Sequence, residues 1–180
     1  MSRQLDGTGM KRLHRDWRRR TEGRVALLLD GVASTFNVGS IVRTAAAERV
    51  EQVWFTTNAT LPTAPGVQKT ALGCDRYIDW TAGGSGVECV AAARAAGWRV
   101  IGVELTDDAV PLHDLDLVSS PVCLAVGHED HGLARETLAA CDAIGFVPQL
   151  GKVGSLNVAV AAALAMYEAR RQEWTRPTSL

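Results

Sequence analysis

The sequence lacks the features that would place the protein in a membrane or outside the cell. It has no run of 18 apolar residues, and residues 1–23 are polar and basic without the apolar stretch of a signal peptide. We therefore expect a cytoplasmic protein that does not enter a membrane. The four cysteines lie far apart and form no Cys-x-x-Cys pair, so we expect reduced, mostly buried thiols.

Motifs of several common chemistries are also missing. Lys152 does not complete G-x-x-x-x-G-K-[ST], no G-x-G-x-x-G follows the first predicted strand, and G-x-S-x-G is absent. These absences argue against a nucleoside triphosphatase, a dinucleotide-dependent oxidoreductase and a serine hydrolase. His128 and His131 have no cysteine or third histidine nearby, so we expect no metal site. Residues 83–86 are glycine-rich, and we interpret them as a turn.

What is present indicates one α/β domain. The chain has 180 residues, 47% of them hydrophobic, which suits a single domain that buries roughly 70% of its unfolded surface. Apolar and β-branched runs predict strands at 24–29, 52–56, 77–80, 99–103, 121–126 and 143–147. Helical patterns predict helices at 37–47, 68–72, 87–96, 135–141 and 155–174. This alternation is typical of a parallel sheet with helices on both faces.

The ends of the chain differ from this domain, which we place at residues 24–174. Residues 1–24 carry eight basic and three acidic side chains, whereas the remaining 156 residues carry 11 basic and 17 acidic ones. We expect residues 1–23 to form a basic arm with a short helix near 12–20 after a flexible start, and 175–180 to form a flexible tail. The charge of the arm fits either a polyanion partner or a solvated tail.

Three predicted loops carry unusual residues, and in parallel α/β sheets ligands lie beyond the carboxyl ends of the strands. Residues 37–43 offer Asn37 and Arg43 near a helix start, which suits a phosphate or a surface ion pair. Glu129 in the loop 127–133 fits a cap of the following helix or a ligand of a substrate hydroxyl. The loop 147–157 fits a helix cap or a binding loop, in which Gly151 and Gly154 allow access to the backbone.

In order along the chain, these loops resemble the motifs of the SpoU/TrmH family, in the SPOUT class of RNA methyltransferases. The first, N-x-G-x-x-x-R-[ST]-A, stands at Asn37-Val-Gly-Ser-Ile-Val-Arg43-Thr-Ala45. The second, G-x-E-x-x-G, stands at Gly127-His-Glu129-Asp-His-Gly132. The third runs from Val147-Pro148 through Gly151 to Ser155-Leu-Asn157-Val-Ala-Val-Ala161. Three motifs in this order are a far more specific signal than any one of them.

The resemblance implies a parallel sheet whose C-terminal part forms a deep trefoil knot, and an obligate homodimer with the active site between subunits. It also implies methyl transfer from S-adenosylmethionine to a ribose 2′-hydroxyl of RNA without a metal. The third motif and residues 167–172 look most like those of the enzymes that methylate a guanosine in the D-loop of tRNA. Enzymes that methylate ribosomal RNA are the alternative. A non-catalytic RNA-binding protein on the same fold is a further alternative. Glu48-Arg49, Asp130 and His131 depart from the commonest residues of the family.

The resemblance assigns roles to individual residues. The catalytic set is Arg43, Asn37, Glu129, Ser155 and Asn157. The expected cofactor-binding residues are Leu124, Ala125, Val126, Gly127, His128, Ile144, Val147, Pro148, Leu150, Gly151, Ser155 and Leu156. The expected RNA-binding residues of the arm are Lys11, Arg12, Arg15, Arg18, Arg19 and Arg20. The other members of the catalytic set would orient Arg43, the ribose and the cofactor. Arg43 would act as the base or, because a neutral guanidinium is costly, as a clamp on phosphate and the developing alkoxide.

Overall fold

The computed structural model describes residues 3–176 and contains one seven-stranded, fully parallel sheet. The order across the sheet is β3-β2-β1-β6-β4-β7-β5. The strands are β1 (Val25–Leu29), β2 (Gln52–Phe55), β3 (Asp79–Ala82), β4 (Arg99–Val103), β5 (Val110–Pro111), β6 (Val122–Val126) and β7 (Ala143–Phe146). The predicted parallel α/β class is confirmed, and β5 is a short edge strand that the sequence pattern did not indicate.

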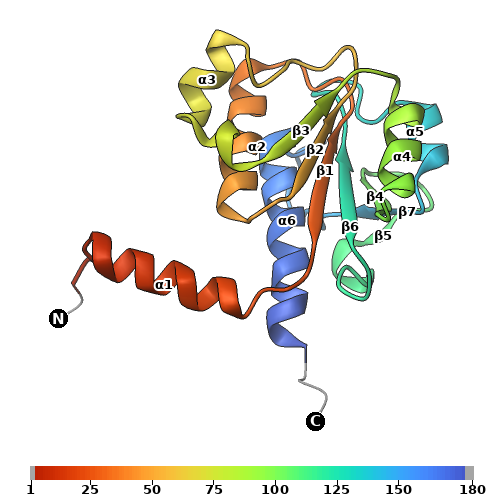
Figure 1. Cartoon of the computed structure of the whole chain (residues 1–180). Coiled ribbons are helices and arrows are strands. Elements are labelled where there is room, and N and C mark those ends of the chain that lie inside the picture. Colours follow the sequence, from red (N-terminus) through yellow and green to blue (C-terminus); the bar gives the residue numbers. More distant parts are fainter. Residues whose placement is uncertain (1–2, 177–180) are drawn as a thin grey trace.

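The helices cover both faces of the sheet, as predicted. They are α1 (Gly7–Arg19), α2 (Thr35–Ala47), α3 (Pro65–Ala71), α4 (Gly86–Ala95), α5 (Arg135–Ala140) and α6 (Val158–Thr175). In Figure 1, α2, α3 and α6 lie on one side of the sheet and α4 and α5 on the other.

The central strand β1 divides the apolar core into two layers. Its side chains alternate between the faces, because successive residues of a strand point in opposite directions. Leu27 and Leu29 pack in the cluster that includes residues of α2 and α6. Ala26 and Leu28 pack in the cluster that includes residues of α4. All five residues of β1 are buried, so the sheet is a rigid support for the loops at its carboxyl edge.

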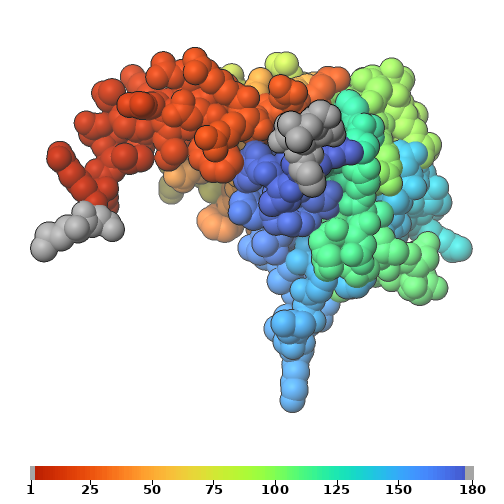
Figure 2. All heavy atoms as spheres, turned by 90° about the horizontal axis from the view of Figure 1, so that it is seen from below, coloured from red at the N-terminus to blue at the C-terminus, as the bar shows by residue number. Residues whose placement is uncertain are grey.

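The N-terminal arm is more ordered than predicted. We expected flexible residues up to about 13, but α1 already begins at Gly7, because the Asp6 side chain accepts a hydrogen bond from Gly9 N (2.7 Å) and caps the helix. The helix buries none of its residues. It projects from the domain in both overall views (Figures 1 and 2).

Other boundaries shift by a few residues. The third strand starts at Asp79 because residues 74–77 form a 3₁₀ turn. The last helix starts at Val158 rather than 155, because Asn157 is its N-cap and accepts from Ala159 N and Val160 N. It continues to Thr175, so the predicted tail begins within the helix, and residues 177–180 of that tail lie outside the described residues.

The cysteines agree with the expected reduced state. All four are free; Cys89 and Cys123 are buried, while Cys74 and Cys141 are half-buried. Burial raises the pKa of the Cys141 thiol to about 11, so this thiol stays protonated near neutral pH. Among residues 3–176, no helix is long and apolar enough to cross a bilayer.

Candidate active site at the carboxyl edge of the sheet

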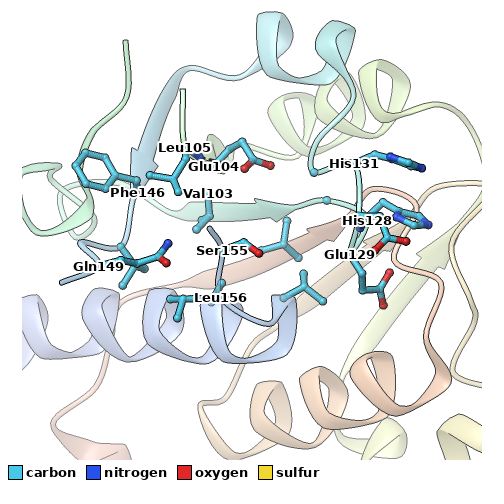
Figure 3. A pocket seen from close by; sticks show the side chains of 17 residues that line it. Val103, Glu104, Leu105, His128, Glu129, His131, Phe146, Gln149, Ser155 and Leu156 are labelled. Carbon is cyan, nitrogen blue, oxygen red and sulfur yellow. Dashed lines mark hydrogen bonds between the residues drawn. The ribbon is translucent and has the colours of Figure 1, made fainter. Parts of the chain in front are cut away.

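A cavity of about 320 Å³ opens at the carboxyl edge of the sheet. Its walls come from the loops that follow β4, β6 and β7 and from the first turn of α6. Figure 3 shows Val103, Leu105, Phe146 and Leu156 on its apolar side and His128 and Glu129 at its other end. The cavity therefore lies where ligands bind in parallel α/β sheets, and two of the three motif loops line it.

The loop after β6 is a tight turn that requires glycine. His128 and Gly132 exchange two backbone hydrogen bonds of 2.9 Å. A Cβ atom on Gly127 would lie 2.0 Å from the carbonyl carbon of Gly132, and one on Gly132 would lie 2.2 Å from Glu104 Oε2. Gly132 also has a φ of +67°, which other residues adopt only with strain. The two glycines of the second motif are thus explained by close packing.

Glu129 joins this loop to the start of α2. One carboxylate oxygen accepts from Ser34 N (2.9 Å) and from Asn37 Nδ2 (2.8 Å), and the other accepts from Ala33 N (3.0 Å). Desolvation by burial opposes ionisation, but these hydrogen bonds outweigh it and lower the pKa of Glu129 to about 2. Glu129 is therefore a carboxylate at neutral pH whose oxygens are already engaged.

Glu129 does not cap the helix that follows it, which was one of its two predicted roles, and the N-cap of α2 is Ser34. Glu129 lies beside the N-terminus of α2, where it accepts from the N–H groups of Ala33 and Ser34. At the start of the following helix, α5, the carboxylate of Asp30 is the acceptor instead: its Oδ2 accepts from Ala134 N (3.2 Å). Each of the loops after β1 and β6 thus contributes a carboxylate that accepts from backbone N–H groups of the other loop, because their strands are neighbours in the sheet. A local sequence pattern does not show which distant loop a carboxylate will bind.

Asn37 extends this network to the third motif. Its side chain, on a residue only 6% exposed, donates to Glu129 and accepts from Asn157 Nδ2 (2.9 Å). Asn157 in turn caps α6 through its Oδ1. The chain Glu129–Asn37–Asn157 therefore links all three motif loops. We refer to these three side chains as the Glu129 network.

Arg43 lies apart from the Glu129 network. It is exposed on α2, and among residues 3–176 it has no hydrogen bond or ion pair to another side chain. It lies six positions after Asn37, so a helix of 3.6 residues per turn places the two on different faces. The expectation that Asn37 orients Arg43 does not hold within one subunit. The surface ion pair considered for Arg43 is not formed either.

The glycines of the first and third motifs differ in what surrounds them. A Cβ atom on Gly39 would lie 2.6 Å from Thr70 Cβ, so this residue allows α2 and α3 to pack closely rather than a ligand to approach. Gly151 and Gly154 have no atoms within 4 Å of an added Cβ, and neither has a positive φ. The structure therefore gives no steric reason for glycine at these two positions.

Several of the predicted cofactor-binding residues line the cavity. They are Val126, Gly127, His128, Val147, Ser155 and Leu156. The others do not line it: Leu124, Ala125, Ile144, Pro148, Leu150 and Gly151. Leu124 and Ala125 are buried within β6, where the two core layers take their side chains. Leu150 is fully exposed, at 101% of its reference area, in the loop that protrudes in Figure 2.

Other residues of the cavity wall were not among the expected cofactor-binding residues. They are Val103, Glu104, Leu105, Asp130, His131, Gly132, Phe146, Gln149, Val158 and Ala161. The loop after β4 was predictable, because it follows a strand of the same parallel sheet and ends at the same edge. Gln149 was not, since nothing in the pattern shows which residues of its loop turn inward. Its Oε1 is buried and has no partner within the described part of the chain.

Electrostatics and coordination chemistry limit what the site can do. No group of three or more His, Cys, Asp or Glu side chains suited to a metal occurs among residues 3–176. His128 and His131 are stacked with ring centroids 4.8 Å apart, and His128 Nδ1 accepts from Asp130 N. The site offers backbone groups, an apolar wall and the fixed carboxylate of Glu129.

The sequence is similar to those of known RNA methyltransferases. The chain is 31% identical over 155 residues to a tRNA (guanosine(18)-2'-O)-methyltransferase of Escherichia coli (strain K12), covering 85% of this chain and 66% of that protein. It is 33% identical over 147 residues to a 23S rRNA (guanosine-2'-O-)-methyltransferase of Acinetobacter baylyi, covering 81% of this chain and 59% of that protein.

Solved structures give the same picture. An AdoMet-bound rRNA methyltransferase from Sinorhizobium meliloti matches with a TM-score of 0.78 and 30% identity, covering 85% of this chain and 58% of that one. The chain thus spans 59% to 66% of the length of the two curated relatives named above. The profile of the SpoU rRNA Methylase family matches residues 24–167, which include all three motifs and the cavity. The chain therefore belongs to the SpoU rRNA Methylase family.

Proposed function

We propose that this protein is an S-adenosylmethionine-dependent RNA methyltransferase that methylates a ribose 2′-hydroxyl. The observation that carries the proposal is the Glu129 network, which links all three motif loops at one end of the cavity. Relatives named as tRNA and as rRNA 2′-O-methyltransferases support it.

The cavity wall fits the proposed cofactor. It combines apolar side chains, including Leu105 and Leu156, with backbone groups of the second and third motif loops. The unpartnered Oε1 of Gln149 is an acceptor for an amino group, which both adenosine and methionine carry. When bound, S-adenosylmethionine would supply an electrophilic methyl group on its sulfonium. Val103, Gln149 and Leu156 would hold it and keep water out.

The Glu129 network would position the loops rather than exchange a proton. All three donors to Glu129 stabilise its ionised form, and its pKa of about 2 makes it a poor base at neutral pH. Ser155, exposed at the cavity wall, and Asn157 would face the ribose. A ribose hydroxyl is a weak nucleophile, so its orientation and the removal of its proton both matter.

Arg43 would act on the substrate from a second subunit. No interaction holds Arg43 near the Glu129 network of its own chain. An active site that uses Arg43 therefore needs another contact to position this side chain. Arg43 of one copy would then complete the cavity of the other, either by drawing off the hydroxyl proton or by clamping phosphate and stabilising the alkoxide.

Exposed apolar side chains support the homodimer that this role requires. They lie on the protruding loop and on α6: Leu150, Val153, Val160, Leu164 and Tyr167. Val160, Leu164 and Tyr167 share one helix face, since their spacing follows i, i+4, i+7. A second copy would bury this surface, and sedimentation of the full chain would show a dimer.

The trefoil knot belongs to the same proposal. Strand β7 lies between β4 and β5, although both precede it in the chain, and α6 then packs on α2 and β6. We infer that the segment from β7 through α6 is threaded to form the knot, whose loops build the cavity.

The RNA substrate is proposed to be a tRNA guanosine, with ribosomal RNA as the alternative. The arm would hold the RNA, because its basic residues are all exposed and phosphates attract such side chains. They are Lys11, Arg12, Arg15, Arg18, Arg19 and Arg20.

A transfer assay tests the proposed function. The full chain is incubated with S-adenosylmethionine labelled in its methyl group and with tRNA or ribosomal RNA transcripts. We expect label in RNA, with tRNA the better acceptor. RNA binding without transfer at saturating cofactor would contradict the enzyme and favour a non-catalytic RNA-binding protein.

A further inference from the structure

The linker between α1 and β1 is held tightly, although α1 itself buries no residue. Thr21 is buried, and its hydroxyl donates to Trp17 O (2.8 Å) and accepts from Trp174 Nε1 (2.9 Å). The carbonyl of Thr21 accepts from Arg49 Nη1 (3.3 Å). The start of the linker is therefore bound to α6 and to the turn after α2.

Glu173 and Arg170 of α6 bind the rest of the linker. Glu173 Oε1 accepts from the N–H groups of both Glu22 and Gly23. The Arg170 side chain, on a residue only 2% exposed, donates to Gly23 O and to Glu48 O, and it lies 3.6 Å from Glu173. These partners satisfy a buried guanidinium that would otherwise be costly. These contacts attach Glu22 and Gly23 of the linker to α6.

The packing of Trp17 also fixes the rotation of α1 about its own axis. The rings of Trp17 and Trp174 lie with centroids 4.9 Å apart. At 3.6 residues per turn, Met10 and Leu13 lie on the same face of α1 as Trp17. Five basic residues point away from this face: Lys11, Arg12, Arg15, Arg18 and Arg19. Arg20 is the exception, since its guanidinium lies over the Trp17 ring, 5.7 Å from the centroid. Because Trp17 faces α6, this basic face points away from α6.

We propose that Thr21–Gly23, together with Arg170, Glu173 and Trp174, form a rigid junction that positions RNA bound to the arm relative to the active site. This proposal rests on the proposed RNA-binding function of the arm. A loose basic tail raises only the local concentration of RNA, which lowers KM. An arm of fixed direction and rotation also decides which nucleotide reaches the cavity, and that choice affects kcat. The junction residues act through the arm and are positioning residues.

An insertion separates these two possibilities in the full chain. Gly-Ser-Gly-Ser placed between Arg20 and Thr21 keeps every charge but disconnects α1 from the junction. The matched control places the same four residues between Leu5 and Asp6, before the helix. We expect the first variant to keep its RNA affinity within about twofold and to keep its salt slope. Its kcat at saturating RNA and cofactor should fall about tenfold or more, with methyl groups spread over additional nucleotides.

A point substitution tests the junction itself. Thr21→Val removes the hydroxyl that joins Trp17 to Trp174, while Thr21→Ser retains it. Hydrogen exchange at the amides of Glu22 and Gly23 should accelerate in Thr21→Val and remain slow in Thr21→Ser, with kcat following the same order. These exchange rates do not depend on any activity.

The outcomes distinguish the failure of the junction from the failure of the arm. If the insertion leaves kcat and the methylated nucleotide unchanged while removal of residues 1–20 weakens RNA binding, the junction proposal is wrong and the RNA-binding role of the arm stands. If removal of residues 1–20 leaves both RNA affinity and salt slope unchanged, both proposals are overturned.

Discussion

The second and third motif loops lie side by side at the cavity, yet one is fixed within the chain and the other is not. The loop 127–133 is closed by two backbone hydrogen bonds and tied to α2 through Glu129. Within residues 3–176, the loop 147–157 is hydrogen-bonded to the rest of the chain only through Asn157, which meets Asn37 and caps α6. Its middle exposes Leu150 and Val153. We propose that the chain alone fixes the first loop, whereas a ligand or a second copy of the chain orders the second.

Substitution of Arg43, the exposed arginine on α2, should have the largest effect on activity. If a second subunit brings Arg43 to the reaction, Arg43→Ala should lower kcat by about a hundredfold to a thousandfold. Cofactor affinity, measured by calorimetry, should change little, because Arg43 does not line the cavity. Lys69→Ala, on the exposed surface of α3, serves as the control. Loss of cofactor binding in Arg43→Ala would contradict the assigned role.

Glycine substitutions compare the two loops directly. Gly127→Ala should lower the free energy of unfolding by about 3 kcal/mol, because the added Cβ overlaps the backbone of Gly132. Gly151→Ala adds the same atom in open space and should leave the free energy of unfolding within about 0.5 kcal/mol. Denaturant unfolding measures both. Equal effects would mean that the two loops are constrained alike.

Glu129→Gln tests whether the carboxylate charge of Glu129 holds the loop 127–133 against α2. The substitution removes a charge that three donors stabilise, so we expect a loss of about 1–3 kcal/mol at pH 7. Folding lowers the pKa of Glu129 from 4.5 to about 2. Its charge therefore stabilises the fold above pH 4.5, and this contribution disappears as the pH falls towards 2. The difference in unfolding free energy between wild type and Glu129→Gln should shrink from pH 7 to pH 3. A constant difference would show that the carboxylate charge is not responsible.

The smallest expected effect concerns the apolar side chains of the open loop. Replacement of Leu150 and Val153 by Ser should leave the unfolding of the isolated subunit nearly unchanged, because both side chains are exposed. If a second copy covers them, sedimentation should show weaker dimerisation, by about tenfold in the dissociation constant. An unchanged dissociation constant would place the interface elsewhere.

The parts of the fold set by local patterns could be predicted from the sequence. The apolar run of β1 and the alternation of strands and helices gave the parallel sheet, and the motif residues Asn37, Glu129 and Asn157 do form one network. Features that depend on distant partners could not be predicted. Glu129 reaches the N–H groups of Ala33 and Ser34 because β1 and β6 are neighbours in space.

The same limit applies to the arm. Its charge was evident, but its fixed attachment depends on Arg170 and Glu173, about 150 residues away. The helical pattern of α6 gave no indication that these two side chains would turn towards the linker. Strand β5 was missed for a simpler reason, since its two residues are too few to show a period.

The position of the transferred methyl group tests the central proposal most directly. RNA methylated by the full chain is digested to nucleosides and analysed by mass spectrometry, which separates ribose from base methylation. Our account predicts a 2′-O-methylated nucleoside that is absent when Arg43→Ala replaces the wild type. A methyl group on the base, or no methyl group at all, would contradict it.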